Sequence, residues 1–515
     1  MAVKIALLVV FFGIMIAVGI YSRRKATNVN DFVLGGRSVG PWMTAFAFGT
    51  SYFSSVVFVG YAGQFGWKYG MASTWIGLGN AFIGSLMAWV ILGRRTRVMT
   101  QKLNSATMPD YFGKRYESNA LKIAASVIVF VFLIPYTASI YNGLSRLFAM
   151  AFDIPYAVCI IVMAVLTGVY VILGGYMATA INDFIQGIIM LIGIVAVIVA
   201  VLNGHGGFYE SVRQLSLIEN DIPISAGQVG AFTSFLGPDV ANLFGVVVLT
   251  SLGTWGLPQM VHKFYAIKDE RAVKTGTVVS TVFAVIVSGG CYFLGGFARL
   301  YSSDPAIYKE DGGVMYDAIV PQMLSTLPDI MIGIVIVLVL SASMSTLSSL
   351  VLTSSSTLTL DLIKGTFVKD MKDKTQMIIM RCLIAFFIIL SVVIALKPPT
   401  FIAQLMGISW GALAGAFLAP FMYGLYSKKV TKASVWASFI VGVGFTVVNM
   451  ILTLVGHPII ASPINAGAAA MVASLVVVPI VSLITPKMDA KKVDEIFTCY
   501  DQKVTVSEKT SLGES

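Results

Sequence analysis

Residues 49–55 read GTSYFSS and residues 250–258 read TSLGTWGLP, and each stretch interrupts a long apolar run. Small and hydroxyl-bearing residues weaken a helix, and Pro258 cannot donate a backbone hydrogen bond. A membrane-spanning helix that breaks at mid-depth exposes backbone groups to a ligand. Two such stretches in corresponding places predict a membrane protein made of two related halves, with a binding site where the breaks meet.

The composition agrees with a membrane protein. The chain has 515 residues, of which 57% are hydrophobic and 12% charged, whereas a soluble protein carries about 25% charged residues. A crossing needs about 20 apolar residues, so thirteen all-α spans are expected. They lie near 5–22, 41–66, 69–92, 123–145, 154–173, 180–203, 241–261, 276–298, 329–360, 376–396, 400–426, 433–456 and 464–486.

The net charge of +10 comes from basic residues that lie between the apolar runs. Clustering of this kind is typical of cytoplasmic loops and does not indicate nucleic-acid binding. With the N-terminus outside and the C-terminus in the cytoplasm, 28 of the 35 Lys and Arg residues lie inside. We therefore expect a multi-pass protein of the plasma membrane, the inner membrane of a bacterium, with the bilayer and a small-molecule substrate as partners and no obligatory protein partner evident.

Five spans precede residue 204 after the first helix, and five more follow residue 240. Because five is odd, the second set enters the membrane from the opposite side, as an inverted repeat requires. The expected divisions are a first helix and cytoplasmic loop (1–40), repeat 1 (41–203), an extracellular loop (204–240), repeat 2 (241–426), two additional helices (427–486) and a cytoplasmic tail (487–515).

Hydroxyl groups crowd the ninth span, where twelve of the nineteen residues from 341 to 359 are Ser or Thr. On a helix they form two arcs that share Ser345. The first arc is Ala342, Ser345 and Thr346, and the second arc is Ser345, Ser348 and Ser349. Hydroxyls with free carbonyls are suitable ligands for Na⁺, although Ser and Thr also pack helices together.

Among the acidic residues, Asp183 alone falls well within a predicted span, and a carboxylate there needs a partner or a role in a pathway. Lys and Arg residues fall in the loops or at span ends; Lys263, for example, is expected in a cytoplasmic loop. The chain lacks a P-loop, an HExxH motif and paired catalytic carboxylates, so an enzyme is not expected. A passive ion or solute channel remains an alternative.

Four motifs resemble the sodium:solute symporters: NDFVLGGRS at 30–38, YVILGG at 170–175 followed by Asp183, the run 341–361, and GLYSKK at 424–429. The resemblance extends from Ala2 to about Lys487. It implies a LeuT-type fold of five plus five inverted helices, with one helix before them and two after, and Na⁺-coupled symport by alternating access.

The resemblance also implies ligands. It maps a first Na⁺ site to Thr50, Phe53, Ala342, Ser345 and Thr346, and a second Na⁺ site, found in some members, to Asp183, Ser345, Ser348 and Ser349. The candidate solute-binding residues are Ser54, Ser55, Tyr141, Asn142, Trp255, Gln259 and Trp410.

Within the family, residues 136–148 look most like the proline permeases. Two departures are Tyr52, where those permeases have Asp, and Tyr176, where a hydrophobic residue is usual. The expected solute is an amino acid such as proline or a small organic acid, with a sugar or another organic solute as the alternative. The sequence leaves open coupling to H⁺ or Li⁺ and a stoichiometry of one or two Na⁺.

Overall fold

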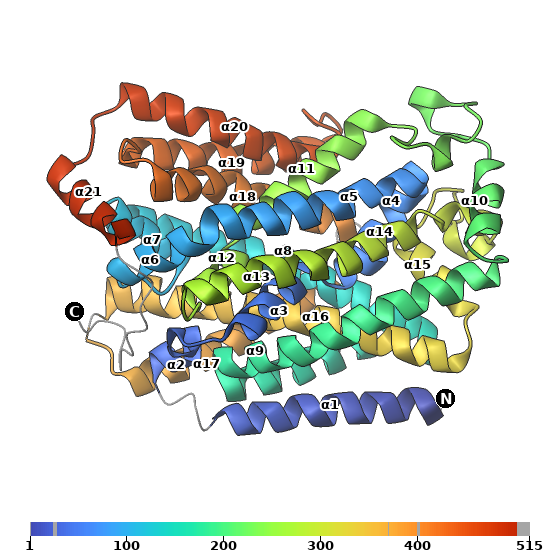
Figure 1. The fold of residues 1–515 in the computed structure, drawn as a ribbon, viewed down its shortest axis with the longest axis horizontal. Coiled ribbons are helices and arrows are strands. Elements are labelled where there is room, and N and C mark those ends of the chain that lie inside the picture. The colour runs from blue at the N-terminus through green and yellow to red at the C-terminus, as the bar shows by residue number, and fades with distance from the viewer. Residues whose placement is uncertain (1, 24–27, 369, 399–401, 502–515) are drawn as a thin grey trace.

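The computed structural model describes residues 2–23, 28–368, 370–398 and 402–501, and its elements are helices. Arg24, Lys25 and the part of the predicted tail after residue 501 lie outside the described residues. Eleven helices are long and apolar enough to cross a membrane, or twelve if the bent pair Val240–Gly256 and Pro258–Tyr265 is one span. They run along the long axis of the molecule (Figure 1), so the chain is an all-α polytopic membrane protein.

The count of thirteen spans is not confirmed, and the difference lies in residues 41–92. There the short helix α3 (Pro41–Tyr52) is followed by a single helical run, Val56–Lys102. This run contains a tight turn at Gly70, whose φ is 59°. A Cβ atom at Gly70 would collide with the backbone of Phe232, so the run turns there without a polar loop that would mark two separate spans.

Both predicted breaks are present. α3 ends at Phe53, which is extended (φ −107°, ψ 131°), and helix resumes in the π-helical turn Val56–Tyr61 and α4 (Ala62–Tyr69). α11 (Val240–Gly256) and α12 (Pro258–Tyr265) meet at Leu257 with a bend of 45°. Pro258 lacks the N–H that would continue the helix.

A kink in α9 (Tyr156–Gly204) separates the predicted spans 154–173 and 180–203. Gly175 has φ 56° and ψ −152° inside this helix, a conformation that strongly favours glycine. A Cβ atom here would lie 2.7 Å from Phe32 Cδ2 and 2.8 Å from Phe32 O. The second half of α9 begins after this kink and carries Asp183, which is buried.

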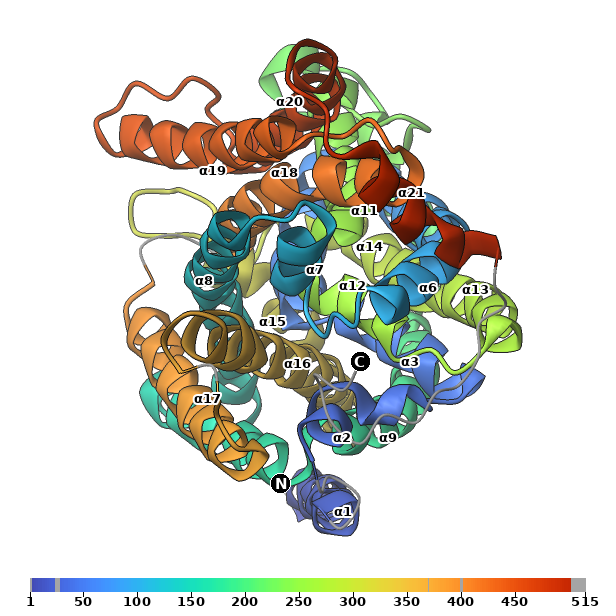
Figure 2. The same cartoon turned by 90° about the vertical axis from the view of Figure 1, so that its left-hand side faces the viewer.

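The buried centre contains α16 (Asp329–Thr357), which continues as the π-helical segment Leu358–Phe367. It packs against α3, α8 and α9 and is enclosed by other helices in the end-on view (Figure 2). α1, α19 and α20 lie at the periphery (Figure 2). Their apolar side chains are exposed, with 67% of Val9 and 72% of Leu483 uncovered, as expected for helices that face lipid.

The helices α10 and α21 lie at opposite ends of the bundle in Figure 1, and we call these ends the α10 end and the α21 end. The boundaries of the two predicted repeats stay a prediction. The helices not yet located are α1 (Ala2–Arg23), α2 (Val29–Leu34), α5 (Thr74–Gly79), α6 (Arg94–Lys102), α7 (Met108–Arg115), α8 (Asn119–Phe152), α10 (Phe208–Ser216), α13 (Glu270–Ala284), α14 (Gly290–Gly295), α15 (Tyr316–Ser325), α17 (Asp373–Leu396), α18 (Ile402–Tyr426), α19 (Lys432–Leu454), α20 (Pro463–Ile484) and α21 (Ala490–Phe497).

Candidate functional site

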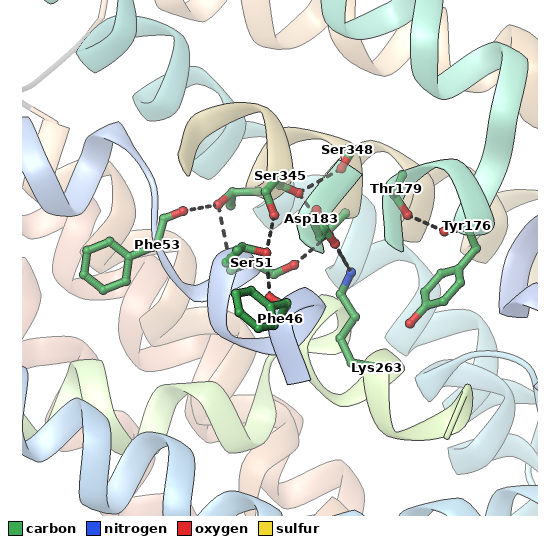
Figure 3. Close-up of polar contacts among 12 residues, drawn as sticks. Phe46, Ser51, Phe53, Tyr176, Thr179, Asp183, Lys263, Ser345 and Ser348 are labelled. Atoms are coloured by element: carbon green, nitrogen blue, oxygen red, sulfur yellow. Dashed lines mark hydrogen bonds and ion pairs between the residues drawn. The ribbon is translucent and has the colours of Figure 1, made fainter. Parts of the chain in front are cut away.

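The first arc of α16 lies against the break of α3 (Figure 3). Thr346 Oγ1 is 2.7 Å from the carbonyl oxygen of Phe53 and 3.1 Å from that of Ala342. Ser345 Oγ donates to Thr50 Oγ1 at 2.7 Å. These five residues, which the resemblance maps to a first Na⁺ site, are all buried and form one cluster.

The break explains why carbonyl oxygens are available at this cluster. The N–H of Phe53 still bonds to Thr50 O at 3.1 Å, but the extended backbone at Phe53 turns its own carbonyl toward Thr346 instead of along a helix axis. The predicted ligands are thus hydroxyl and carbonyl oxygens without a charged side chain. Uncharged oxygen ligands of this kind suit a hard cation.

The second arc lies beside the first on α16. Ser348 Oγ and Ser349 Oγ each donate to the carbonyl oxygen of Ser345, at 2.8 and 3.1 Å. Ser349 Oγ is also 2.9 Å from Ser51 Oγ on α3. Asp183 faces this arc from α9 (Figure 3) and is fully buried, so the structure brings the predicted members of the second site together.

Lys263 corrects the sequence-based expectation. It does not lie in an exposed loop: its side chain is only 2% exposed, and Nζ is 3.4 Å from Asp183 Oδ2 and 2.9 Å from Ser349 Oγ (Figure 3). Nζ also lies 5.3 Å from the centroid of the Tyr176 ring. The break at Leu257 accounts for the difference, because α12 continues inside the bundle instead of ending the span.

The predicted solute-binding residues do not form one cluster. At the α3 break, the backbone N–H of Ser55 donates to Ser343 Oγ at 3.1 Å, and Ser55 Oγ donates to Ile140 O at 2.8 Å. Ser54 Oγ accepts from the N–H of Val56 at 3.2 Å. The break therefore packs between α8 and α16.

The other candidates point in several directions. Tyr141 is buried on α8, and the amide oxygen of Asn142 accepts from Arg146 Nε at 3.1 Å, toward the α10 end. Trp255 Nε1 donates to Ile83 O at 3.0 Å. Gln259 is buried in α12, and its Oε1 has no hydrogen-bond partner within the described part of the chain.

Trp410 lies in an aromatic group with Tyr52 and Tyr136, which are not among the predicted solute-binding residues. Its ring stacks on Tyr52 with centroids 6.2 Å apart and meets Tyr136 edge-on at 5.9 Å. Tyr52 Oη donates to Thr250 O at 2.7 Å, so this side chain links the two interrupted helices α3 and α11. In the sequence, the feature that points to Tyr52 is its departure from the pattern of the proline permeases.

A buried ion network holds the α21 end of α16. Asp361 Oδ2 accepts from Thr107 at 2.5 Å, and Oδ1 lies 3.5 Å from Lys122 Nζ. The helical run Asp329–Gly365 includes Asp361, so Asp183 is not the only acidic residue inside a span.

The same network contains Asp110. Burial opposes ionisation of its carboxyl, but the ammonium groups of Lys114 and Lys122 hold the pKa of Asp110 below its usual value.

A polar cavity of about 530 Å³ lies at the opposite, α10 end of the bundle. Gln64, Lys68 and Asp239 contribute to its lining. Arg299, also in the lining, binds Asp221 at 2.6 Å, and this contact lowers the pKa of the Asp221 carboxyl.

The chain has known relatives. The model of the sodium:solute symporter family matches residues 32–442. The osmoregulated proline transporter OpuE of Bacillus subtilis (strain 168) is 27% identical over 436 residues, covering 84% of this chain and 86% of OpuE. The sodium/proline symporter of Staphylococcus aureus (strain USA300) is 30% identical over 448 residues, covering 85% of this chain and 83% of that protein.

Two solved structures have the same architecture. A Na⁺-coupled sialic acid symporter in a substrate-bound outward-open state gives a TM-score of 0.70 at 17% identity, over 95% of this chain and 99% of that one. The nucleobase-cation-symport-1 family transporter Mhp1, in a closed conformation, gives 0.51 at 12% identity over 90% and 98%. These likenesses support the expected LeuT-type fold. The family model covers well over half of the chain, so the chain belongs to the sodium:solute symporter family.

Proposed function

We propose that the chain is a Na⁺-coupled secondary active transporter that imports a small amino acid, proline or a close analogue, by alternating access. The observation that carries this proposal is the approach of Thr346 Oγ1 to Phe53 O and Ala342 O, at 2.7 and 3.1 Å, where α3 is broken. The proposed Na⁺ ligands are Thr50, Phe53, Ala342, Ser345 and Thr346.

We propose that Na⁺ binding and solute binding are coupled because both use the break of α3. The same break supplies the Phe53 carbonyl to the proposed ion site and carries Ser54 and Ser55, two of the candidate solute-binding residues. An ion that orders the break prepares the pocket for the solute, and a bound solute holds the break for the ion. Such reciprocity is what coupled binding requires.

One Na⁺ supplies enough energy for uptake. A membrane potential of 100 mV contributes about 2.3 kcal/mol per charge, and a tenfold concentration gradient adds about 1.4 kcal/mol. The total of about 3.7 kcal/mol sustains a solute accumulation on the order of 500-fold. The import direction follows from the inward electrochemical gradient of Na⁺. In the proposed orientation the N-terminus is outside and the C-terminus lies in the cytoplasm of a bacterial cell.

The solute class rests on the pocket and on the relatives. Tyr52, Tyr136 and Trp410 offer ring faces for a compact apolar ring, and the helix that restarts after Ser55 directs the positive end of its dipole at the break, where a carboxylate is favoured. The OpuE transporter and the S. aureus symporter are named for proline.

Uptake into liposomes tests the proposal. Purified protein is reconstituted, and accumulation of radiolabelled L-proline, lactate and glucose is compared with an inward Na⁺ gradient or with K⁺ alone. We expect Na⁺-dependent accumulation of proline only, and a higher Na⁺ requirement for that accumulation in Thr346→Ala. Equal uptake in K⁺ would refute Na⁺ coupling, and a solute-independent Na⁺ current would favour a channel. Accumulation of lactate or glucose instead of proline would overturn the solute class alone.

A further inference from the structure

The ammonium group of Lys263 lies where the second site would hold an ion. Nζ is 3.4 Å from Asp183 Oδ2 and 2.9 Å from Ser349 Oγ (Figure 3). Two of the predicted members of that site are therefore already bound to a cation that belongs to the chain. Asp183 and Lys263 come from different helices, α9 and α12, so the pairing depends on the fold.

The surroundings of Nζ suit an ammonium group better than Na⁺. Its third neighbour is the face of the Tyr176 ring, 5.3 Å from Nζ to the centroid. A ring face attracts an organic cation but offers no oxygen to a hard metal ion. Tyr176 stands where the family usually has a hydrophobic residue, and its ring completes the environment of the Lys263 ammonium together with one carboxylate and one hydroxyl.

The charges at the second site already balance. Asp183 and Lys263 are 0% and 2% exposed, and a buried carboxylate needs a counter-charge close by. Lys263 supplies it permanently, so a Na⁺ ion at the second arc would add an unbalanced positive charge next to an ammonium group. At the first arc, the predicted ligands are neutral and no such obstacle exists.

We propose that Lys263 is a tethered cation that replaces Na⁺ at the second site, so that this transporter binds one Na⁺ per cycle, at the first arc. The inference rests on the proposed function and makes its stoichiometry specific. The accumulation of solute is then limited to the ratio that one ion supports, whereas two coupled ions would square that ratio.

Counting bound ions tests the inference without the solute. Saturating ²²Na⁺ binding is measured on the purified full-length chain, in detergent, for the wild type, Lys263→Met, Lys263→Arg and Asp183→Asn/Lys263→Met. We expect one Na⁺ per chain in the wild type and two in Lys263→Met, because removal of the ammonium leaves the Asp183 carboxylate to attract an ion. Lys263→Arg and the double variant should each return to one.

Lys428→Met is the matched control for loss of a lysine, because Lys428 is half exposed and binds Asp494 at the α21 end; it should bind one Na⁺. A second Na⁺ in the wild type would overturn the inference, and so would a single Na⁺ in folded Lys263→Met. If Lys263→Met does not fold, Thr346→Ala decides: at the Na⁺ concentration that just saturates the wild type we expect less than one bound Na⁺ per chain, and a full remaining ion that disappears with Asp183→Asn would overturn the inference.

The outcomes separate the two proposals. Two Na⁺ ions in the wild type leave the proposed symport intact and remove only the role of Lys263. No Na⁺ binding in the wild type contradicts the proposed function and the inference together.

Discussion

The two arcs of α16 share Ser345 and the same helix, yet their chemistry differs. The first arc meets carbonyl and hydroxyl oxygens at the break of α3, with no charged side chain in the predicted ligand set. The second arc meets Asp183, which already holds the ammonium group of Lys263. The comparison teaches that the number of oxygen ligands does not by itself define an ion site: an exchangeable cation binds where no ammonium group of the chain already occupies the oxygens.

The largest expected effect comes from breaking the ion pair of the second arc. Asp183→Asn leaves the Lys263 ammonium buried without its counter-charge, which should cost about 3–5 kcal/mol of stability. Asp183→Asn/Lys263→Met removes both charges and should recover most of this loss. Unfolding in mixed detergent micelles measures both. A double variant that is less stable than the single one would contradict the pairing.

A smaller effect is expected where the backbone positions the second arc. Gly175→Ala forces a Cβ atom onto Phe32 at a φ of 56°, which should cost about 2–3 kcal/mol. Gly168→Ala is the matched control on α9, since its nearest neighbour is the flexible end of Ile388 at 3.3 Å. Equal melting temperatures for the two variants would show that the kink does not need glycine.

The first arc is expected to respond in ion affinity instead of stability. Thr346→Ala removes the hydroxyl that contacts Phe53 O and Ala342 O, and should raise the Na⁺ concentration for half-maximal uptake by about 10- to 100-fold, which corresponds to roughly 1.4–2.7 kcal/mol. Thr281→Ala is the control, because its hydroxyl donates to Thr277 O of its own helix, away from the first arc. An unchanged Na⁺ requirement in Thr346→Ala would remove the first site.

The smallest effect should come from Ser348. The Ser348 hydroxyl donates to Ser345 O, one turn back along α16, and not to Lys263. Ser348→Ala should therefore change stability by less than about 0.5 kcal/mol and leave Na⁺ binding at one ion per chain. A loss of Na⁺ affinity similar to that of Thr346→Ala would mean that the second arc takes part in ion binding after all.

The sequence predicts features that depend on local chemistry. Pro258 and the small residues around Thr50 weaken their own helices, so the breaks could be located, and the spacing of hydroxyls defines both arcs. The fold was therefore largely predictable, apart from the span count, where Gly70 turns the chain without a polar loop.

The burial of Lys263 was not predictable in this way. Asp183 and Lys263 are 80 positions apart, and no periodic pattern joins them. A lysine just after an apolar run resembles a loop residue unless the direction of α12 after its break is known. Tyr52 and Tyr136 were visible as family-pattern residues, but their stacking with Trp410 depends on three different helices.

The continuity of α16 has a mechanical consequence. From Ala342 to Asp361 the helix is unbroken, a distance of about 29 Å at 1.5 Å per residue. At the α21 end, Asp361 accepts a hydrogen bond from Thr107 and forms an ion pair with Lys122. A continuous helix of this length is stiff, so a tilt of α16 about Ser345 would also displace Asp361 from Thr107 and Lys122.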